Sequence, residues 1–301
     1  MIFTVTFNPA IDYVMRLPRL VPGATNRSSE EEIYFGGKGI NVSVVLRRLG
    51  VPTKALGFVA GFTGEAIEQA TLAEGVDCDF VKLPQGFSRI NVKIKCGGET
   101  ELNGQGPQIP QTAIDELFEK LGRLEKGDTL VLAGSIPNTL PGDIYERILE
   151  KLDGRGIRFV VDATRDLLVN VLKYHPFLIK PNNHELGEIV GKDLNTDEEI
   201  VAAAQKLRQM GAENVLVSMA GSGSILLDGN GQTHRIGVAK GKLVNSVGAG
   251  DSMVAGFLAG CILKSDYAYA LKLGTACGGA TAFSPGLADK ETVERLLKTL
   301  E

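Results

Sequence analysis

Short runs of β-branched and apolar residues alternate along this chain with amphipathic segments, and a glycine or a proline usually separates one from the next. Several of the short runs are apolar on both faces, which is typical of parallel strands that helices cover on both sides. The alternation therefore predicts an α/β fold built on a mostly parallel central sheet. We expect its strands at residues 2–7, 129–133, 157–162, 177–180 and 215–219.

Helices are expected between these strands, where apolar residues recur at positions i, i+3, i+4 and i+7. Residues 114–121, 200–207 and 293–300 each show this spacing. Thr196 and Glu199 stand at the start of the second segment, and their spacing is typical of a capping box.

Residues 12–36 and 86–104 break this rhythm, because their strands alternate polar and apolar side chains, as in the run from Arg89 to Lys95. Alternation is typical of a sheet with one solvated face. We expect a small sheet that projects from the central one and acts as a lid. No linker, repeat or low-complexity tract divides the 301 residues. Residues 1–301 are therefore predicted to form one domain with a lid subdomain.

The composition argues against two classes of partner. The chain has 36 acidic and 32 basic residues, a net charge of −4 at pH 7, whereas a nucleic-acid-binding protein usually shows a basic excess. No apolar stretch reaches the ~20 residues of a membrane helix. The four cysteines lack metal-ligand spacing and are expected to be reduced thiols. We therefore predict a cytoplasmic protein with a small-molecule substrate.

Several common catalytic fingerprints are absent from the sequence. The first strand is not followed by GxGxxG, and no GK pair continues with Ser or Thr, so neither a dinucleotide site nor a Walker loop is expected. The GxSxG and HExxH motifs are also missing. These absences argue against a nicotinamide dehydrogenase.

A glycine-rich segment with an aspartate leads into an apolar helix that we expect at 253–263. Gly248, Ala249 and Gly250 would expose backbone N–H groups at the helix start, which makes an anion site. Asp251 follows them and could accept a hydroxyl proton while these amides neutralise a phosphoryl group. It could equally serve only to stabilise the helix N-terminus, and the residues alone leave both interpretations open.

Two further clusters also stand at helix starts. Gly37, Lys38 and Asn41 open a helix expected at 42–49 and combine a flexible turn with a charge and an amide. Asn182 and Glu185 follow a buried strand, and ligands of parallel sheets bind at the carboxyl ends of strands. The first cluster could also be an ordinary turn with an exposed lysine, and the second an ordinary helix start.

Together these clusters resemble the ribokinase-like carbohydrate kinases, also called the phosphofructokinase-B family. The segment Val247–Ser252 looks like the C-terminal GAGD motif of the family, and the segment Gly36–Val42 looks like its di-glycine motif. Their order and their separation of about 210 residues are highly specific. The resemblance covers the whole chain and implies a three-layer α/β/α sandwich with a small β-sheet lid.

The resemblance also implies a reaction, the transfer of the γ-phosphoryl group of ATP to a sugar hydroxyl with Mg²⁺. Asp251 would be the base, and Gly248, Ala249 and Gly250 the anion hole. Glu185 would act indirectly on Mg²⁺. The sugar-contacting positions would be Asp12, Gly37, Lys38 and Asn41. The nucleotide-contacting positions would be Lys180, Asn182, Ser218, Met219, Ala220, Gly221, Ser222, Gly223 and Gly250.

The opening Thr6–Asp12 resembles the hexose-phosphate branch of the family. The expected substrate is therefore a phosphorylated ketohexose, first of all fructose 1-phosphate, which would give fructose 1,6-bisphosphate. Tagatose 6-phosphate and fructose 6-phosphate are the alternative substrates. A regulator that binds a sugar phosphate without turnover is the alternative from another class, although it would have no use for Asp251.

A substrate that already carries a phosphate needs locally placed cations, because the chain is net acidic. By resemblance Arg89 is expected near that phosphate, with Lys38 and Arg27 as further candidates. Arg89 could instead be a solvated residue on the wet face of the lid. The resemblance also suggests a homodimer formed through the lid sheets, which would cover an exposed edge.

Overall fold

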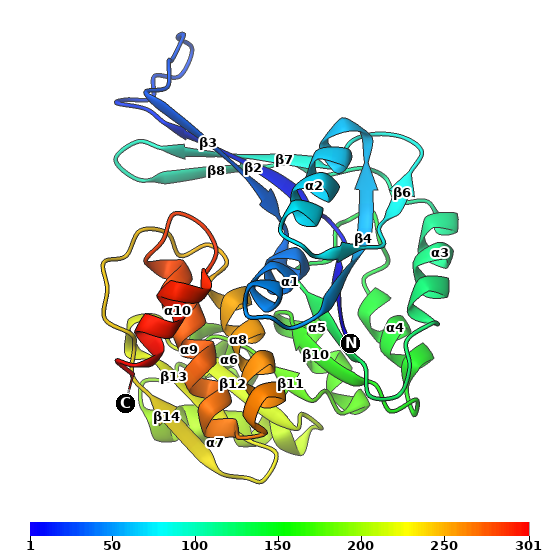
Figure 1. Ribbon diagram of the computed structural model, residues 1–301, viewed down its shortest axis with the longest axis vertical. Helices are drawn as coiled ribbons and strands as arrows, with labels where there is room; N and C mark the ends of the chain where they lie inside the picture. Colours follow the sequence, from blue (N-terminus) through cyan, green and yellow to red (C-terminus); the bar gives the residue numbers. More distant parts are fainter. Residues whose placement is uncertain (301) are drawn as a thin grey trace.

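A computed structural model describes residues 1–300 of the chain (Figure 1). Its centre is a ten-stranded sheet in the order β14-β13-β12-β11-β10-β9-β1-β4-β5, with β6 beside β4. All neighbours are parallel except β12–β13 and β13–β14. The strands are β1 (Ile2–Thr6), β4 (Thr53–Ala60), β5 (Asp77–Cys78), β6 (Val81–Leu83), β9 (Thr129–Ala133), β10 (Arg158–Asp162), β11 (Leu178–Ile179), β12 (Asn214–Ser218), β13 (Ser224–Leu227) and β14 (Thr233–Ile236).

Helices cover both faces of this sheet. One face packs against α3 (Gln111–Leu121), α4 (Ile144–Leu152), α5 (Arg165–Val171), α6 (Asn183–Val190) and α7 (Asp197–Gln209). The other face packs against α1 (Lys38–Arg48), α2 (Gly61–Ala73), α8 (Ala249–Lys264), α9 (Tyr267–Ala282) and α10 (Lys290–Leu297). This is the predicted three-layer sandwich, and the fold prediction is confirmed. Among residues 1–300, no helix has both the length and the apolar character that crossing a membrane requires.

Helix starts differ from the sequence prediction where glycines precede the apolar run. The helix expected from 42 begins at Lys38, and the helix expected from 253 begins at Ala249, because polar and small residues form the first turn of each. The capping box of Thr196 and Glu199 is present as predicted. Both early starts bring candidate site residues into ordered first turns.

The two segments that broke the α/β rhythm contain the strands of a separate four-stranded sheet, which we call the lid. Its order is β3-β2-β7-β8, and it extends from the body at the top of Figure 1. The strands are β2 (Ala10–Arg16), β3 (Glu30–Gly36), β7 (Arg89–Lys95) and β8 (Glu99–Asn103).

The register of the lid sorts its side chains into two faces. Asp12 pairs with Tyr34 and Asn91, and Val14 pairs with Lys93, so these side chains share one face, the inner face. The neighbouring positions form the outer face, which exposes the large apolar residues Ile33, Phe35, Ile90 and Leu102. The polar face is thus the covered one, since Asn91 and Lys93 are each only 7% exposed.

Candidate active site

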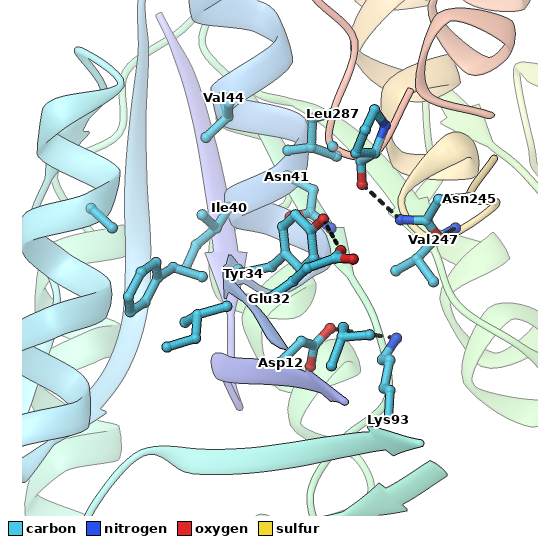
Figure 2. Close-up of a pocket in the computed structure, with 18 of the residues that line it drawn as sticks. Asp12, Glu32, Tyr34, Ile40, Asn41, Val44, Lys93, Asn245, Val247 and Leu287 are labelled. Carbon is cyan, nitrogen blue, oxygen red and sulfur yellow. Dashed lines mark hydrogen bonds and ion pairs between the residues drawn. The ribbon is translucent and has the colours of Figure 1, made fainter. Parts of the chain in front are cut away.

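A cavity of about 530 Å³ lies between the lid and the carboxyl edge of the central sheet. Asp12 and Lys93 of the lid, Gly37 and Asn41 of the α1 start and the segment 285–287 all contribute to its wall. Figure 2 shows the side chains of Asp12 and Lys93 close together on adjacent strands of the lid, with Asn41 above them in the view. The cavity therefore joins the lid to the start of α1, and Val247, just before the start of α8, also lines it.

Glycine is required where α1 meets β1. Gly37 has φ near 145°, and a Cβ on Gly39 would lie 2.6 Å from the carbonyl oxygen of Val5. The N–H of Ile40 donates to the Thr6 hydroxyl at 3.0 Å. The di-glycine segment thus lets the first turn of α1 press against the end of β1, which turns Asn41 toward the cavity.

Asn41 connects this helix start to the second one, 210 residues later in the chain. Its side-chain N–H donates to Oδ2 of Asp251 at 2.8 Å. Asp251 lies in the first turn of α8 behind Gly248, which has φ near 79° and no room for a Cβ beside Leu287. The two motifs therefore form one site.

The carboxyl group of Asp251 is only 4% exposed. Burial raises its pKa to about 6, the nearby charge of Asp162 adds to the rise, and Lys38 and Asn41 oppose it. A base with a pKa slightly below 7 is largely ionised at neutral pH and can still accept a proton.

Asp162 lies at the end of β10 and is a site residue that the sequence analysis missed. Its Oδ2 accepts from the Lys38 ammonium at 3.2 Å, and its Oδ1 lies 3.4 Å from Nζ of Lys180. Burial alone would raise the pKa of Asp162, but the two lysines outweigh it and lower the pKa. Burial alone would lower the pKa of Lys38, but Asp162 and Asp251 raise it. A charged residue at the carboxyl end of an apolar strand was the available sequence signal.

Lys180 also approaches the start of α8. A Cβ on Gly250 would lie 3.2 Å from Nζ of Lys180, so the glycine leaves space between the ammonium and the backbone. An ammonium and the N-terminus of a helix would both attract an anion placed there.

The candidate nucleotide residues meet at the ends of β11 and β12. Asn182 forms a bridge to Ser218, after which the segment 219–223 turns into β13. Asn182 and Glu185 form a complete capping box at the start of α6, with both hydrogen bonds at 2.8 Å. Asn182 and Glu185 therefore do form a helix start, as the alternative interpretation predicted. The second carboxylate oxygen of Glu185 takes no part in the capping box.

The two candidate arginines lie at different places in the lid. Arg89 begins β7, is half-buried, and donates from Nε to the carbonyl of Asn8 at 3.1 Å. Burial lowers the pKa of its guanidinium. It is not the fully solvated residue that the alternative supposed. Arg27 is exposed in the loop between β2 and β3, at the outer end of the lid, and neither arginine lines the cavity.

Comparison with known proteins agrees with this geometry. The model of the pfkB family of carbohydrate kinases matches residues 5–293. The chain belongs to this family. It is 48% identical to the 1-phosphofructokinase of Bacillus subtilis over 99% of the chain and 97% of that protein. It is 36% identical to the D-tagatose-1-phosphate kinase of Bacillus licheniformis over 100% of the chain and 99% of that protein.

A solved structure shares the architecture. The crystal structure of phosphofructokinase-2 from Escherichia coli in complex with fructose-6-phosphate superposes with a TM-score of 0.90 at 25% identity, over 99% of this chain and 98% of that one. The expected fold, family and enzyme class are thereby confirmed, and the chain is a sugar-phosphate kinase.

Opposite pKa shifts in the two aspartates predict opposite effects on stability. Ionising Asp251 costs folding free energy as the pH rises from about 4 to about 6, so Asp251→Asn should stabilise the protein by roughly 2–3 kcal/mol at pH 7.5. The gain should shrink toward pH 4. Urea denaturation at several pH values measures it.

Asp162→Asn is the matched control. Its lowered pKa means that the carboxylate contributes stability above about pH 4, so the substitution should destabilise the protein at neutral pH, by roughly 3–5 kcal/mol. Equal effects of the two substitutions would contradict this account of the cluster.

Proposed function

We propose that this enzyme transfers the γ-phosphoryl group of ATP to the 6-hydroxyl of fructose 1-phosphate and produces fructose 1,6-bisphosphate and ADP. The observation that carries the proposal is the hydrogen bond between Asn41 and the buried Asp251, which makes one site of the two family motifs. The 48% identity to a 1-phosphofructokinase over nearly the whole chain supports the choice of sugar.

In the proposed reaction Asp251 is the general base. The O6–H proton of the sugar passes to Asp251, the bond from O6 to the γ-phosphorus forms, and the bond from that phosphorus to the leaving oxygen of ADP breaks. The backbone N–H groups of Gly248, Ala249 and Gly250 would hold the transferred phosphoryl oxygens. Lys38 and Lys180 would offset its negative charge. Positioning and charge neutralisation account for most of such a catalysis.

The nucleotide would bind along Asn182, Ser218 and the turn made of Met219, Ala220, Gly221, Ser222 and Gly223. Mg²⁺ is proposed as a cofactor that would neutralise phosphate charge at this site, with Glu185 acting on it indirectly. The charge of Glu185 is near enough to contribute to the raised pKa of Lys38. Residues 1–300 contain no group of three or more acidic, histidine or cysteine side chains that could hold a metal. Mg²⁺ in kinases needs only one or two carboxylates besides the phosphates.

D-Tagatose 1-phosphate is a second candidate substrate, supported by the 36% identity to a kinase of that name. The sequence analysis named a different tagatose phosphate, tagatose 6-phosphate, as an alternative substrate. Fructose 6-phosphate remains a further candidate. A coupled ADP-release assay with all four sugar phosphates and free fructose compares them. Release of ADP with none of them would favour a regulator without turnover. The cytoplasmic location stays a prediction.

The role of Asp251 predicts a specific loss of turnover. Asp251→Asn keeps the shape and removes the proton acceptor, so kcat should fall by ~10²–10⁴-fold while sugar binding changes little. Because the pKa of Asp251 is raised to about 6, wild-type kcat/KM should fall roughly tenfold per pH unit below that value. Steady-state kinetics between pH 5 and 8 measures both. Retention of more than about a tenth of turnover would remove Asp251 from the role of base.

The phosphate that the sugar already carries is proposed to bind near Arg89, with Lys38 close by and Arg27 as the weaker candidate. Among residues 1–300, Arg89 uses only its Nε in a hydrogen bond, to the carbonyl of Asn8, so the rest of its guanidinium can bind phosphate oxygens. Arg89→Ala should raise KM for the sugar phosphate at least about tenfold, or ~1.4 kcal/mol, with KM for ATP unchanged. Loss of ATP affinity instead, or a wild-type preference for free fructose, would contradict the assignment.

We propose a homodimer in which the outer faces of two lids pack against each other. Ile33, Phe35, Ile90 and Leu102 are between 36% and 58% exposed on one face of a small sheet, and such a patch is typical of an interface. Ile33 and Phe35 also contribute to the wall of the cavity. A second copy of the lid is the partner proposed to cover this patch.

Leu102→Glu should convert the dimer to a monomer, because it places a charge in the proposed apolar contact. Light scattering after gel filtration measures the mass against 32.1 kDa for one chain. Met210→Glu, on the far side of the molecule and 47% exposed, is the matched control. A wild-type protein that is monomeric at micromolar concentration would refute the interface.

A further inference from the structure

The geometry points to Asn91 and Lys93 as positioning residues that fix the carboxylate of Asp12 and thereby determine which ketohexose epimer the site accepts. This inference rests on the function proposed above and assigns its specificity. Asp12, Asn91 and Lys93 lie on the inner face of the lid, and Asp12 and Lys93 line the cavity. Neither Asn91 nor Lys93 belongs to a motif found in the sequence.

Asn91 can be oriented in only one way. Its Oδ1 accepts the backbone N–H of Gly104 at 3.2 Å, so its NH₂ group must face the other way, where it donates to Oδ1 of Asp12 at 2.8 Å. Gly104 itself has no room for a side chain, because a Cβ would lie 2.7 Å from the carbonyl oxygen of Ile90. The backbone that follows β8 thus fixes one oxygen of Asp12 through Asn91.

Lys93 constrains the other oxygen. Its Nζ lies 3.5 Å from Oδ2 of Asp12 and 3.5 Å from Oε1 of Glu101, and its side chain is 9% exposed. Lysine is almost never this buried unless it is paired. Figure 2 shows its ammonium beside Asp12 at the cavity wall. Asp12 is therefore held at both oxygens, from two neighbouring positions of β7.

A carboxylate held in this way can distinguish between the cis and trans arrangements of two hydroxyls. Each carboxylate oxygen has two acceptor positions, so Asp12 retains capacity toward the cavity in fixed directions. In the furanose ring the 3- and 4-hydroxyls are trans in fructose and cis in tagatose, which are epimers at C4. A fixed acceptor satisfies one arrangement, and the other leaves polar groups unpaired. A mobile carboxylate would adapt to both.

The test compares fructose 1-phosphate with D-tagatose 1-phosphate. For Asn91→Ala and Lys93→Met, the ratio of kcat/KM values for the two sugars should fall at least about fivefold, through a higher KM for the preferred sugar. The kcat for that sugar and KM for ATP should each change less than about twofold. Lys93→Arg, which keeps the charge, should restore most of the ratio.

Asn103→Ala is the matched control. Asn103 pairs with Asn91 across the strands but is exposed and does not line the cavity. Within residues 1–300 its side chain donates only to Oε2 of Glu101, whereas Lys93 approaches Oε1. For this variant, the ratio of kcat/KM values for the two sugars should equal that of the wild type. If Asn91→Ala does not fold, Lys93→Met still tests the inference. The apolar side chain of methionine can replace the buried aliphatic part of Lys93, so this variant should fold.

Unchanged ratios in the folded variants, or losses in kcat in place of KM, would overturn the inference. A wild-type enzyme that accepts both epimers equally would also overturn it and leave the proposed kinase activity standing. A wild-type enzyme that phosphorylates neither sugar would refute the proposed function itself, and titration calorimetry with each sugar phosphate would then show whether epimer-selective binding persists without turnover.

Discussion

The carboxylate of Asp162 is the counter-charge on which the buried end of the site depends. It gives one oxygen to Lys38 and the other to Lys180, from a side chain that is 5% exposed. Without it the ammonium of Lys180, whose side chain is only 7% exposed, would be buried without a counter-charge, which costs several kcal/mol. Because the three residues come from β10, from the start of α1 and from the end of β11, this single carboxylate also determines how those elements meet. The anion site beside Asp251 is assembled around it.

Close backbone contact is the second constraint, and glycine provides it on both sides of the site. Gly39 touches β1, and Gly256 and Gly260 of α8 leave space for α9, where a Cβ would lie 2.7 Å and 2.5 Å from the nearest atoms. Both contacts draw a helix close to its neighbour. The first turns that carry Asn41 and Asp251 are therefore held rigidly enough for a 2.8 Å hydrogen bond between residues 210 positions apart.

The sequence predicted most of the fold and the parts of the site that lie in local motifs. Strand runs and helical spacing give the sandwich because its elements are locally coded, and the helix-start motifs identify Asn41 and Asp251. Asp162 was missed because a single carboxylate at a strand end has no motif around it. Asn91 and Lys93 were missed because they occupy ordinary polar positions of an alternating strand, and their contact with Asp12 depends on sheet register. The outer-face exposure was likewise not predicted, since alternation alone does not say which face is covered.

Because side chains alternate along the lid strands, one strand register must place polar residues on the inner face and apolar residues on the outer face. Asp12 of β2 and Lys93 of β7 point inward, while Ile90 of β7 and Leu102 of β8 point outward. A slip of one residue between β2 and β7 would turn the cavity wall apolar and expose charges on the outer face. The hydrogen bond from Asn91 to Asp12 opposes such a slip, because it ties one position of β7 to one position of β2. The contacts that orient Asp12 thus also hold the lid in the register that keeps its two faces distinct.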